Sequence, residues 1–287
     1  MISLVLGGVM LAYLLAAILF LMSELWASPR LQGSARVILW AGLGAHTGAF
    51  LGRWVNSYGM ALGHTPAAGF SEHLRLVILQ APLSNFYESL VFFAWCLPFL
   101  AFFTFRRHLL GYLGSVVAIL ACLLLAYASL GGVDSRIKPL MPALKSNWLL
   151  VHVVTCFLGY AAFALAFGTA GLYLYQARRP RPSLPPLRQL DRLIYQTTTL
   201  GFLLLTLGIL TGAVWAESAW GRYWSWDPKE TWSLITWLIY VTLLHARLVK
   251  GWQGRRIAWL AVLGFLAVLF TYFGVSFLLT GLHSYLN

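Results

Sequence analysis

Long apolar runs separated by short polar segments constrain this sequence more than any other feature. Each run holds about 20 residues, the length that an α-helix needs to cross the hydrocarbon core of a bilayer. The sequence therefore predicts an all-α, polytopic membrane helix bundle of about eight transmembrane helices, in one domain over 1–287. The eight runs lie at about 2–22, 35–52, 86–104, 109–129, 149–176, 193–215, 230–248 and 257–280.

The charge and the cysteine content exclude some kinds of partner and some kinds of site. Only 10% of the 287 residues are charged, and the net charge is +12. In a polytopic protein such an excess of cations marks cytoplasmic loops, so the lipid bilayer is an expected partner and nucleic acid is not. Cys96, Cys122 and Cys156 lie inside apolar runs without C-x-x-C spacing, which suggests neither a disulfide framework nor a zinc site.

The distribution of Lys and Arg predicts the orientation. One set of alternate loops holds 13 of these residues and the other holds 7, so the first set is expected on the cytoplasmic side. Both termini then lie on the outer, non-cytoplasmic side, as does the loop after the sixth run. The first run lacks a basic start and a small-residue cleavage site, so we interpret it as a retained helix.

A tryptophan-rich loop on the predicted outer side covers residues 215–230 and reads WAESAWGRYWSWDPKE. Indole rings offer flat, apolar, polarizable faces with one N–H donor each, which suits a large, flat, apolar ligand. An ordinary interfacial aromatic belt is the alternative, because Trp and Tyr gather at headgroup level in most membrane proteins. The four candidate ligand-binding tryptophans are Trp215, Trp220, Trp224 and Trp226.

The end of this loop has the pattern of a helix start. Asp227 is a candidate N-cap, Pro228 fits the first helical position, and Glu230 completes a capping box. This pattern favours a structural role for Asp227, with a place in the ligand site as the second interpretation. Lys229 and Arg222 are the cations of the loop, and ligand carboxylates are candidate partners for them.

Two of the seven histidines lie at the outer side, where the tryptophan-rich loop is expected. His152 begins the fifth run and His283 follows the eighth. A bis-histidine haem site needs one imidazole on each face of the iron, with apolar and aromatic groups over the porphyrin. The sequence therefore predicts that His152 and His283 are axial ligands of an outer haem.

Two further histidines lie at mid-depth or in the inner part of the membrane. His46 is about 16 Å into its run, and His245 is about 22 Å from the outer surface, at 1.5 Å per residue. Ionisable groups at such depth are functional candidates, so a second haem pair is predicted, with neutral, hydrogen-bonded histidines as the alternative. We interpret His64, His73 and His108 as packing or surface residues.

The residues at 220–230, WGRYWSWDPKE, resemble the tryptophan-rich WWD motif of haem-handling membrane proteins. Nearly the whole chain resembles the CcsA (ResC) family of system II cytochrome c biogenesis proteins, and the DPKE ending favours this family over the system I relatives. The segments that support the resemblance are PLSNFYESLVFFAW at 82–95, PALKSNWLLVHVVTCFLGYAAF at 142–163 and GLHSYLN at 281–287.

The resemblance implies a function, a cofactor and partners. The cofactor is haem b, bound by His46 and His245 within the membrane and by His152 and His283 beside the WWD loop. The family attaches haem to the C-x-x-C-H segment of apocytochrome c, and the chain resembles the haem-handling subunit of a holocytochrome c synthase that works with a CcsB (ResB) partner. Its location is the bacterial inner membrane or the thylakoid membrane, with the loop on the periplasmic or lumenal side.

Three other functions remain possible from the residues. A haem exporter that passes haem to a chaperone without covalent chemistry shares every residue named above. A b-type electron-transfer protein needs paired histidines on both sides of the membrane. An ion-coupled transporter needs carboxylates within the membrane, whereas Glu88 and Asp227 lie at its edges.

Overall fold

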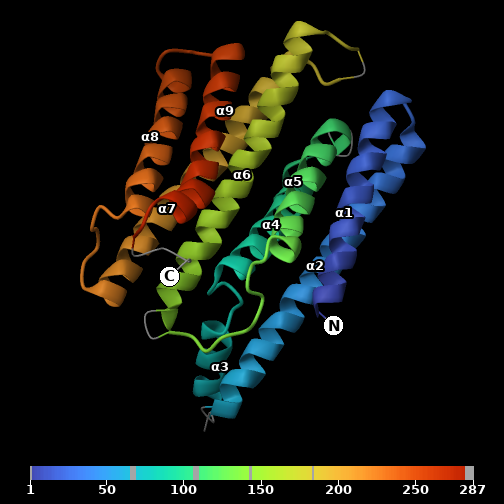
Figure 1. Cartoon of the computed structure of the whole chain (residues 1–287). Helices are drawn as coiled ribbons and strands as arrows, with labels where there is room; N and C mark the ends of the chain where they lie inside the picture. Colours follow the sequence, from blue (N-terminus) through green and yellow to red (C-terminus); the bar gives the residue numbers. More distant parts are fainter. Residues whose placement is uncertain (1, 65–68, 106–109, 142–143, 183, 282–287) are drawn as a thin grey trace.

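The computed structural model describes residues 2–64, 69–105, 110–141, 144–182 and 184–281, and their regular structure is helical (Figure 1). The all-α fold is therefore confirmed. The elements in chain order are α1 (Ile2–Leu25), α2 (Pro29–His64), α3 (Phe70–Leu79), α4 (Phe86–Thr104), α5 (Leu110–Leu130), α6 (Asn147–Arg178), α7 (Leu187–Trp220), α8 (Pro228–Leu248), α9 (Arg255–Leu269), the π-helix η3 (Phe270–Gly274) and α10 (Val275–Leu278).

Six helical segments in the described part of the chain are long and apolar enough to cross a membrane. They are Ile2–Leu25, Phe86–Thr104, Gly111–Leu130, Asn147–Arg178, Leu187–Trp220 and Arg255–Leu278. The other two predicted spans fall on α2 and α8, which are helical but carry more polar and charged residues. The structure thus supports a polytopic membrane protein, while eight spans and the side of each terminus stay predictions.

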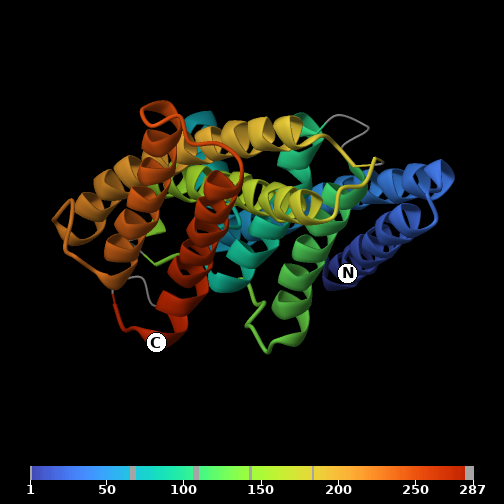
Figure 2. The same ribbon diagram turned by 90° about the horizontal axis from the view of Figure 1, so that it is seen from above.

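The helices form two groups that meet at α6. In the first group α1 packs on α2 and α5, and α4 packs on α5; in the second, α7, α8 and α9 pack around one another (Figures 1 and 2). Helix α6 lies between the groups and contacts α4, α7 and α9. Residues at neighbouring ends of α6, α7 and α8 therefore lie together, where α6 meets the second group of helices.

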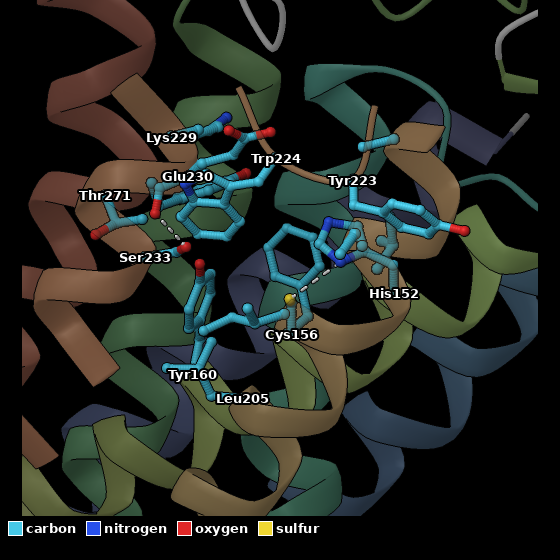
Figure 3. A pocket seen from close by; sticks show the side chains of 17 residues that line it. His152, Cys156, Tyr160, Leu205, Tyr223, Trp224, Lys229, Glu230, Ser233 and Thr271 are labelled. Carbon is cyan, nitrogen blue, oxygen red and sulfur yellow. Dashed lines mark hydrogen bonds between the residues drawn. The ribbon is translucent and has the colours of Figure 1, made fainter. Parts of the chain in front are cut away.

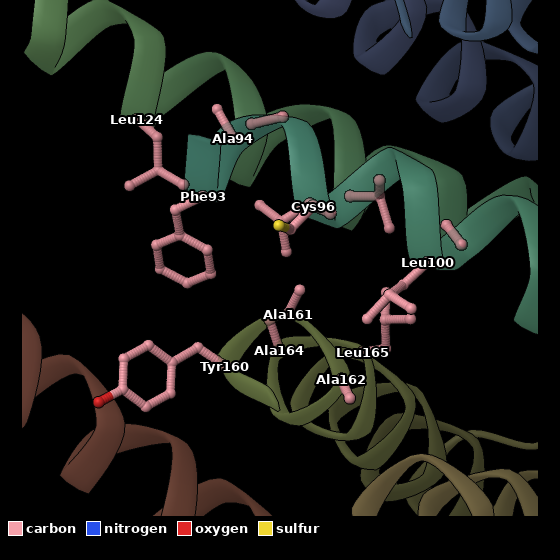
Figure 4. Packing of buried hydrophobic residues seen from close by; sticks show 14 of the residues in the cluster. Phe93, Ala94, Cys96, Leu100, Leu124, Tyr160, Ala161, Ala162, Ala164 and Leu165 are labelled. Atoms are coloured by element: carbon pink, nitrogen blue, oxygen red, sulfur yellow. The ribbon is translucent and has the colours of Figure 1, made fainter. Parts of the chain in front are cut away.

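Small residues let α6 and α7 approach closely. A Cβ atom on Gly201 would lie 2.6 Å from the ring of Phe163, and one on Gly208 would lie 2.5 Å from the Sγ atom of Cys156. Membrane helices associate mainly through such close packing, because lipid gives no hydrophobic driving force between them. On the other face of α6, Ala161 and Ala164 pack near Phe93 and Cys96 of α4 (Figure 4).

Buried ion pairs hold the two ends of the bundle. The Nε atom of Arg53 in α2 donates to Glu88 of α4 over 2.9 Å, and both side chains are buried. Toward the opposite end, the guanidinium of Arg247 in α8 donates two hydrogen bonds to Asp191 of α7, at 3.1 and 2.7 Å. The N–H of Gly254, just before α9, also donates to Asp191, so this carboxylate joins three helices.

Candidate functional site

A pocket opens between the start of α6, the end of α7, the start of α8 and the π-helix η3 (Figure 3). It contains roughly 830 Å³ of free space, counting the space at its open mouth, and 17 residues line it. Among the lining residues that matter most are His152, Cys156, Trp224, Lys229, Glu230 and Thr271. The sequence placed His152 and the tryptophan-rich loop at one surface, and the structure brings them into one pocket.

His152 is held in a defined tautomer and orientation. Its Nδ1 atom lies 2.7 Å from the carbonyl oxygen of Gly208. A carbonyl oxygen only accepts, so Nδ1 carries the proton and Nε2 carries the lone pair. The imidazole also stacks on the indole of Trp215, with the ring planes 12° apart and the centroids separated by 6.1 Å. Metal-binding histidines are typically fixed in this way, with the second ring nitrogen bonded to a carbonyl or carboxylate.

A glycine makes room for this imidazole. A Cβ atom on Gly212 would lie 2.5 Å from Nδ1 of His152 and 2.7 Å from Cε1. Any larger residue at this position would therefore push the ring away from α7. Sequence reasoning missed Gly212, because no spacing within one helix shows where a second helix crosses it.

The four tryptophans do not form one flat platform. Trp215 is buried and meets Trp220 edge-on, while Trp224 and Trp226 meet at an interplanar angle of 86°. Only Trp224 of these four lines the pocket. Its Nε1 atom is buried and has no hydrogen-bond acceptor among the described residues, whereas the side chain of Trp226 is 67% exposed.

The carboxylate of Glu230 fixes the shape of the loop. Its Oε2 atom accepts from the backbone N–H groups of Ser225 at 2.7 Å and Asp227 at 3.1 Å. These donors flank Trp226, whose φ of 59° lies in the left-handed region that a bulky residue rarely adopts. The Oδ1 atom of Asp227 accepts from the N–H of Lys229, so the predicted capping box is confirmed.

The structure does not bring the two inner histidines together. His46 is fully buried in α2 with its Nδ1 atom 3.2 Å from the hydroxyl oxygen of Tyr13 in α1, whereas His245 is exposed in the last turn of α8. Helix α2 packs on α1, α3, α4 and α5, while α8 packs on α7, α9 and the segment after it. Figures 1 and 2 place the two helices on opposite sides of the molecule. The structure thus places the two imidazoles on helices that do not pack together, and a haem shared by His46 and His245 stays a prediction.

The remaining histidines have separate positions. His73 of α3 lies 2.6 Å from the hydroxyl oxygen of Tyr58, measured at Nδ1, as expected for a packing residue. His64 is the last residue of α2. His108 and the predicted axial ligand His283 lie outside the described residues.

Comparison with known proteins shows which family this chain is similar to. The family described as Cytochrome C assembly protein matches residues 83–283, a region that includes His152, the tryptophan-rich loop and His245. The chain belongs to this family. His46 lies outside the matched region.

Individual relatives agree with the family assignment. The chain is 46% identical over 213 residues to the cytochrome c biogenesis protein CcsA of Chlamydomonas reinhardtii, a match that covers 71% of this chain and 60% of that protein. It is 44% identical over 229 residues to CcsA of Guillardia theta and 41% identical over 235 residues to CcsA of Synechococcus sp. (strain RCC307); each match covers 71% of this chain and 76% of the relative. The resemblance to CcsA-type cytochrome c biogenesis proteins is confirmed.

A solved structure shares the fold. The cytochrome c haem lyase CcmF superposes with a TM-score of 0.71 at 22% sequence identity, over 95% of this chain and 46% of that chain. At this identity the likeness concerns the fold alone. The family description and the names of the CcsA relatives concern the assembly and biogenesis of cytochrome c, and the chain spans 60% of the length of the Chlamydomonas reinhardtii protein.

Proposed function

We propose that this CcsA-type protein binds haem b in the pocket around His152 and presents it to apocytochrome c. The observation that carries the proposal is the 2.7 Å hydrogen bond from Nδ1 of His152 to the carbonyl of Gly208. It directs the lone pair to Nε2, the arrangement that an axial ligand of haem iron requires. His283 is the proposed second ligand, and it follows two residues after Gly281, which lies against Asp227 and Pro228.

The pocket fits a porphyrin in its chemistry. Its walls combine aromatic and aliphatic side chains such as Phe157, Leu205 and Trp224 with a small number of polar groups. A large apolar ligand with few polar substituents needs this distribution. The buried N–H of Trp224 further favours a ligand that carries a hydrogen-bond acceptor.

The chemistry supported by this pocket is thioether formation. Haem supplies two vinyl groups, and each thiol of a C-x-x-C-H segment adds its sulfur to one vinyl carbon and its hydrogen to the other. The addition needs no oxidant. The protein contributes by placing the reactants: His152, oriented by its stacking on Trp215, would hold the ligand, while the exposed loop around Tyr223 leaves one side open to a partner.

The proposal includes a partner and an orientation. A CcsB (ResB) membrane protein is the expected partner, and the WWD loop is expected on the periplasmic or lumenal side of a bacterial inner membrane or thylakoid membrane. A haem bound by His46 and His245 within the membrane stays part of the proposal. His46 lies in contact with the hydroxyl group of Tyr13 in α1, and His245 is exposed on α8.

Absorption spectroscopy of the purified chain tests the proposal. We expect a reduced b-type spectrum from the wild-type protein purified with its partner, and a weakened or altered spectrum after His152→Ala. His73→Ala is the matched control, because His73 bonds to Tyr58 on α2, whereas the pocket is built from α6, α7, α8 and η3. A wild-type complex that never carries haem would contradict haem binding, and an unchanged spectrum in His152→Ala would place the haem elsewhere.

A haem exporter is the second candidate function, because it would use the same pocket. Co-expression with an apocytochrome that contains one C-x-x-C-H segment separates the two candidates. Holocytochrome synthesis gives haem that stays with the cytochrome polypeptide after denaturation. An exporter gives only haem that denaturation releases.

A further inference from the structure

Helix α8 turns hydroxyl groups toward the interior of the second helix group. Thr236 and Tyr240 are fully buried, whereas Thr242 on another face of the helix is exposed. The hydroxyl oxygen of Thr236 lies 2.9 Å from that of Thr271, which lines the pocket. Polar groups at membrane depth avoid lipid by facing other helices, so this placement accounts for part of the polar content of α8.

The hydroxyl group of Tyr240 has no hydrogen-bond partner among the described residues. Its ring stacks on Phe163 of α6, with the centroids 3.5 Å apart, and a Cβ atom on Gly264 of α9 would lie 2.9 Å from the hydroxyl oxygen. Phe163 also packs against Gly201 of α7, which lies one turn from Thr198. A hydroxyl group that leaves water for such an apolar environment is destabilising unless it gains another hydrogen bond.

Thr198 of α7 carries a second hydroxyl group of this kind. In four other threonines of the same helix, the hydroxyl group donates to the carbonyl of the residue four positions earlier; these are Thr197, Thr199, Thr206 and Thr211. The hydroxyl group of Thr198 is fully buried and makes no hydrogen bond to the described part of the chain. Because a helical threonine can readily form the bond within its own helix, this hydroxyl group is directed toward a different acceptor.

The two hydroxyl groups share a depth and a face of the helix group. Asp191 of α7 is hydrogen-bonded to Arg247 of α8, so these two residues are level. Thr198 follows Asp191 by seven residues and Tyr240 precedes Arg247 by seven residues, each time toward the pocket, where α7 ends and α8 begins. Seven residues make nearly two full turns and a rise of about 10.5 Å. Thr198 and Tyr240 therefore face the same junction as the ion pair, at a similar height above it.

We infer that this junction holds an ordered internal water molecule, which the hydroxyl groups of Tyr240 and Thr198 bind. Each hydroxyl group offers one donor and two acceptor sites, and a buried water molecule typically makes about three hydrogen bonds. The site lies outside the pocket and does not depend on a bound haem. It continues the buried polar groups from the Thr236–Thr271 pair at the pocket wall toward Asp191.

Removal of each hydroxyl group tests the water site. Tyr240→Phe and Thr198→Val keep the shape of the side chain, and loss of a hydroxyl group that bonds to nothing is neutral or stabilising. We expect each variant to lower the folding equilibrium constant of the detergent-purified chain about 2-fold to 10-fold in a denaturation assay. The double variant should lose less than the product of the two factors, because both hydroxyl groups act through one water molecule.

Thr242→Val is the matched control, because Thr242 is exposed and its hydroxyl group donates to the carbonyl of Leu238 in the same helix. Its effect should combine with that of Tyr240→Phe without coupling. A high-resolution cryo-EM map should show a water oxygen within hydrogen-bond distance of both hydroxyl groups. The inference fails if Tyr240→Phe is as stable as the wild-type chain or more stable. It also fails if Tyr240→Phe and Thr198→Val act independently, or if the map shows their hydroxyl groups bonded directly to each other.

Discussion

Replacing Gly212 by alanine disturbs the outer site without removing any group that binds a ligand. The added Cβ atom would lie 2.5 Å from Nδ1 of His152. Ordinary contact begins near 3.4 Å, so the imidazole has to move by about 0.9 Å away from α7. Gly208 lies on α7 as well, so this movement lengthens the 2.7 Å bond to its carbonyl to about 3.6 Å, beyond hydrogen-bond range.

The effect of this movement on stability and on haem affinity follows from the loss of the hydrogen bond between His152 and the carbonyl of Gly208. A buried hydrogen bond contributes about 0.5–1.5 kcal/mol to stability. Loss of the partner that orients a metal-bound histidine typically lowers metal affinity about 10-fold to 100-fold. We therefore expect Gly212→Ala to raise the haem dissociation constant by about 10-fold to 100-fold.

Titration of the purified protein with haem, followed at the Soret band, measures this change. Gly44→Ala is the control, because Gly44 is also helical and a Cβ there would meet nothing within 4 Å. Both variants share the same gain in helix propensity, so their difference isolates the contact with His152. Equal haem affinity and equal spectra in the two variants would refute the assignment of His152 as a ligand held by Gly208.

Three other predictions concern the ion pairs, the loop and the orientation. Asp191→Asn should lower stability by about 1–3 kcal/mol in a denaturation assay, because it removes the charge from a partly buried, doubly hydrogen-bonded ion pair, whereas Asp134→Asn in an exposed pair should change nothing measurable. Glu230→Gln should speed amide exchange of residues 224–227; unchanged exchange would show that its carboxylate does not fix the loop. A membrane-impermeant maleimide should label Tyr223→Cys but not Lys250→Cys in intact cells, and the reverse pattern would invert the topology.

Local features of the fold could be predicted from the sequence. The capping box of Asp227 and Glu230 lies within four consecutive residues, and it forms as predicted. The apolar runs likewise predict where the helices lie, because length and hydropathy are properties of one segment. The residues of α2 and α8 show the limit of this approach, since their polar content leaves them below the hydropathy of the other six segments.

Contacts between helices could not be predicted in this way. The position of His46 and His245 along their helices gave a similar depth for both, but depth says nothing about lateral distance in the membrane. The structure places the two on helices that do not pack together. His152 is bonded to Gly208 because of how α6 crosses α7, and Lys229 is bonded to Ser276 because of how α10 meets α8. No sequence signal marks either crossing.

The order of the pocket residues along the chain has a consequence for biosynthesis. His152 lies in α6, Trp224 and Lys229 follow after α7, and Thr271 comes only in η3. At about 5–20 residues per second, His152 is synthesised roughly 6–24 s before Thr271. A nascent chain therefore has the imidazole of His152 and the indole of Trp224 well before it has Thr271 of η3. The pocket therefore gains the side chains of Thr271 and Tyr272 only after η3 has been synthesised.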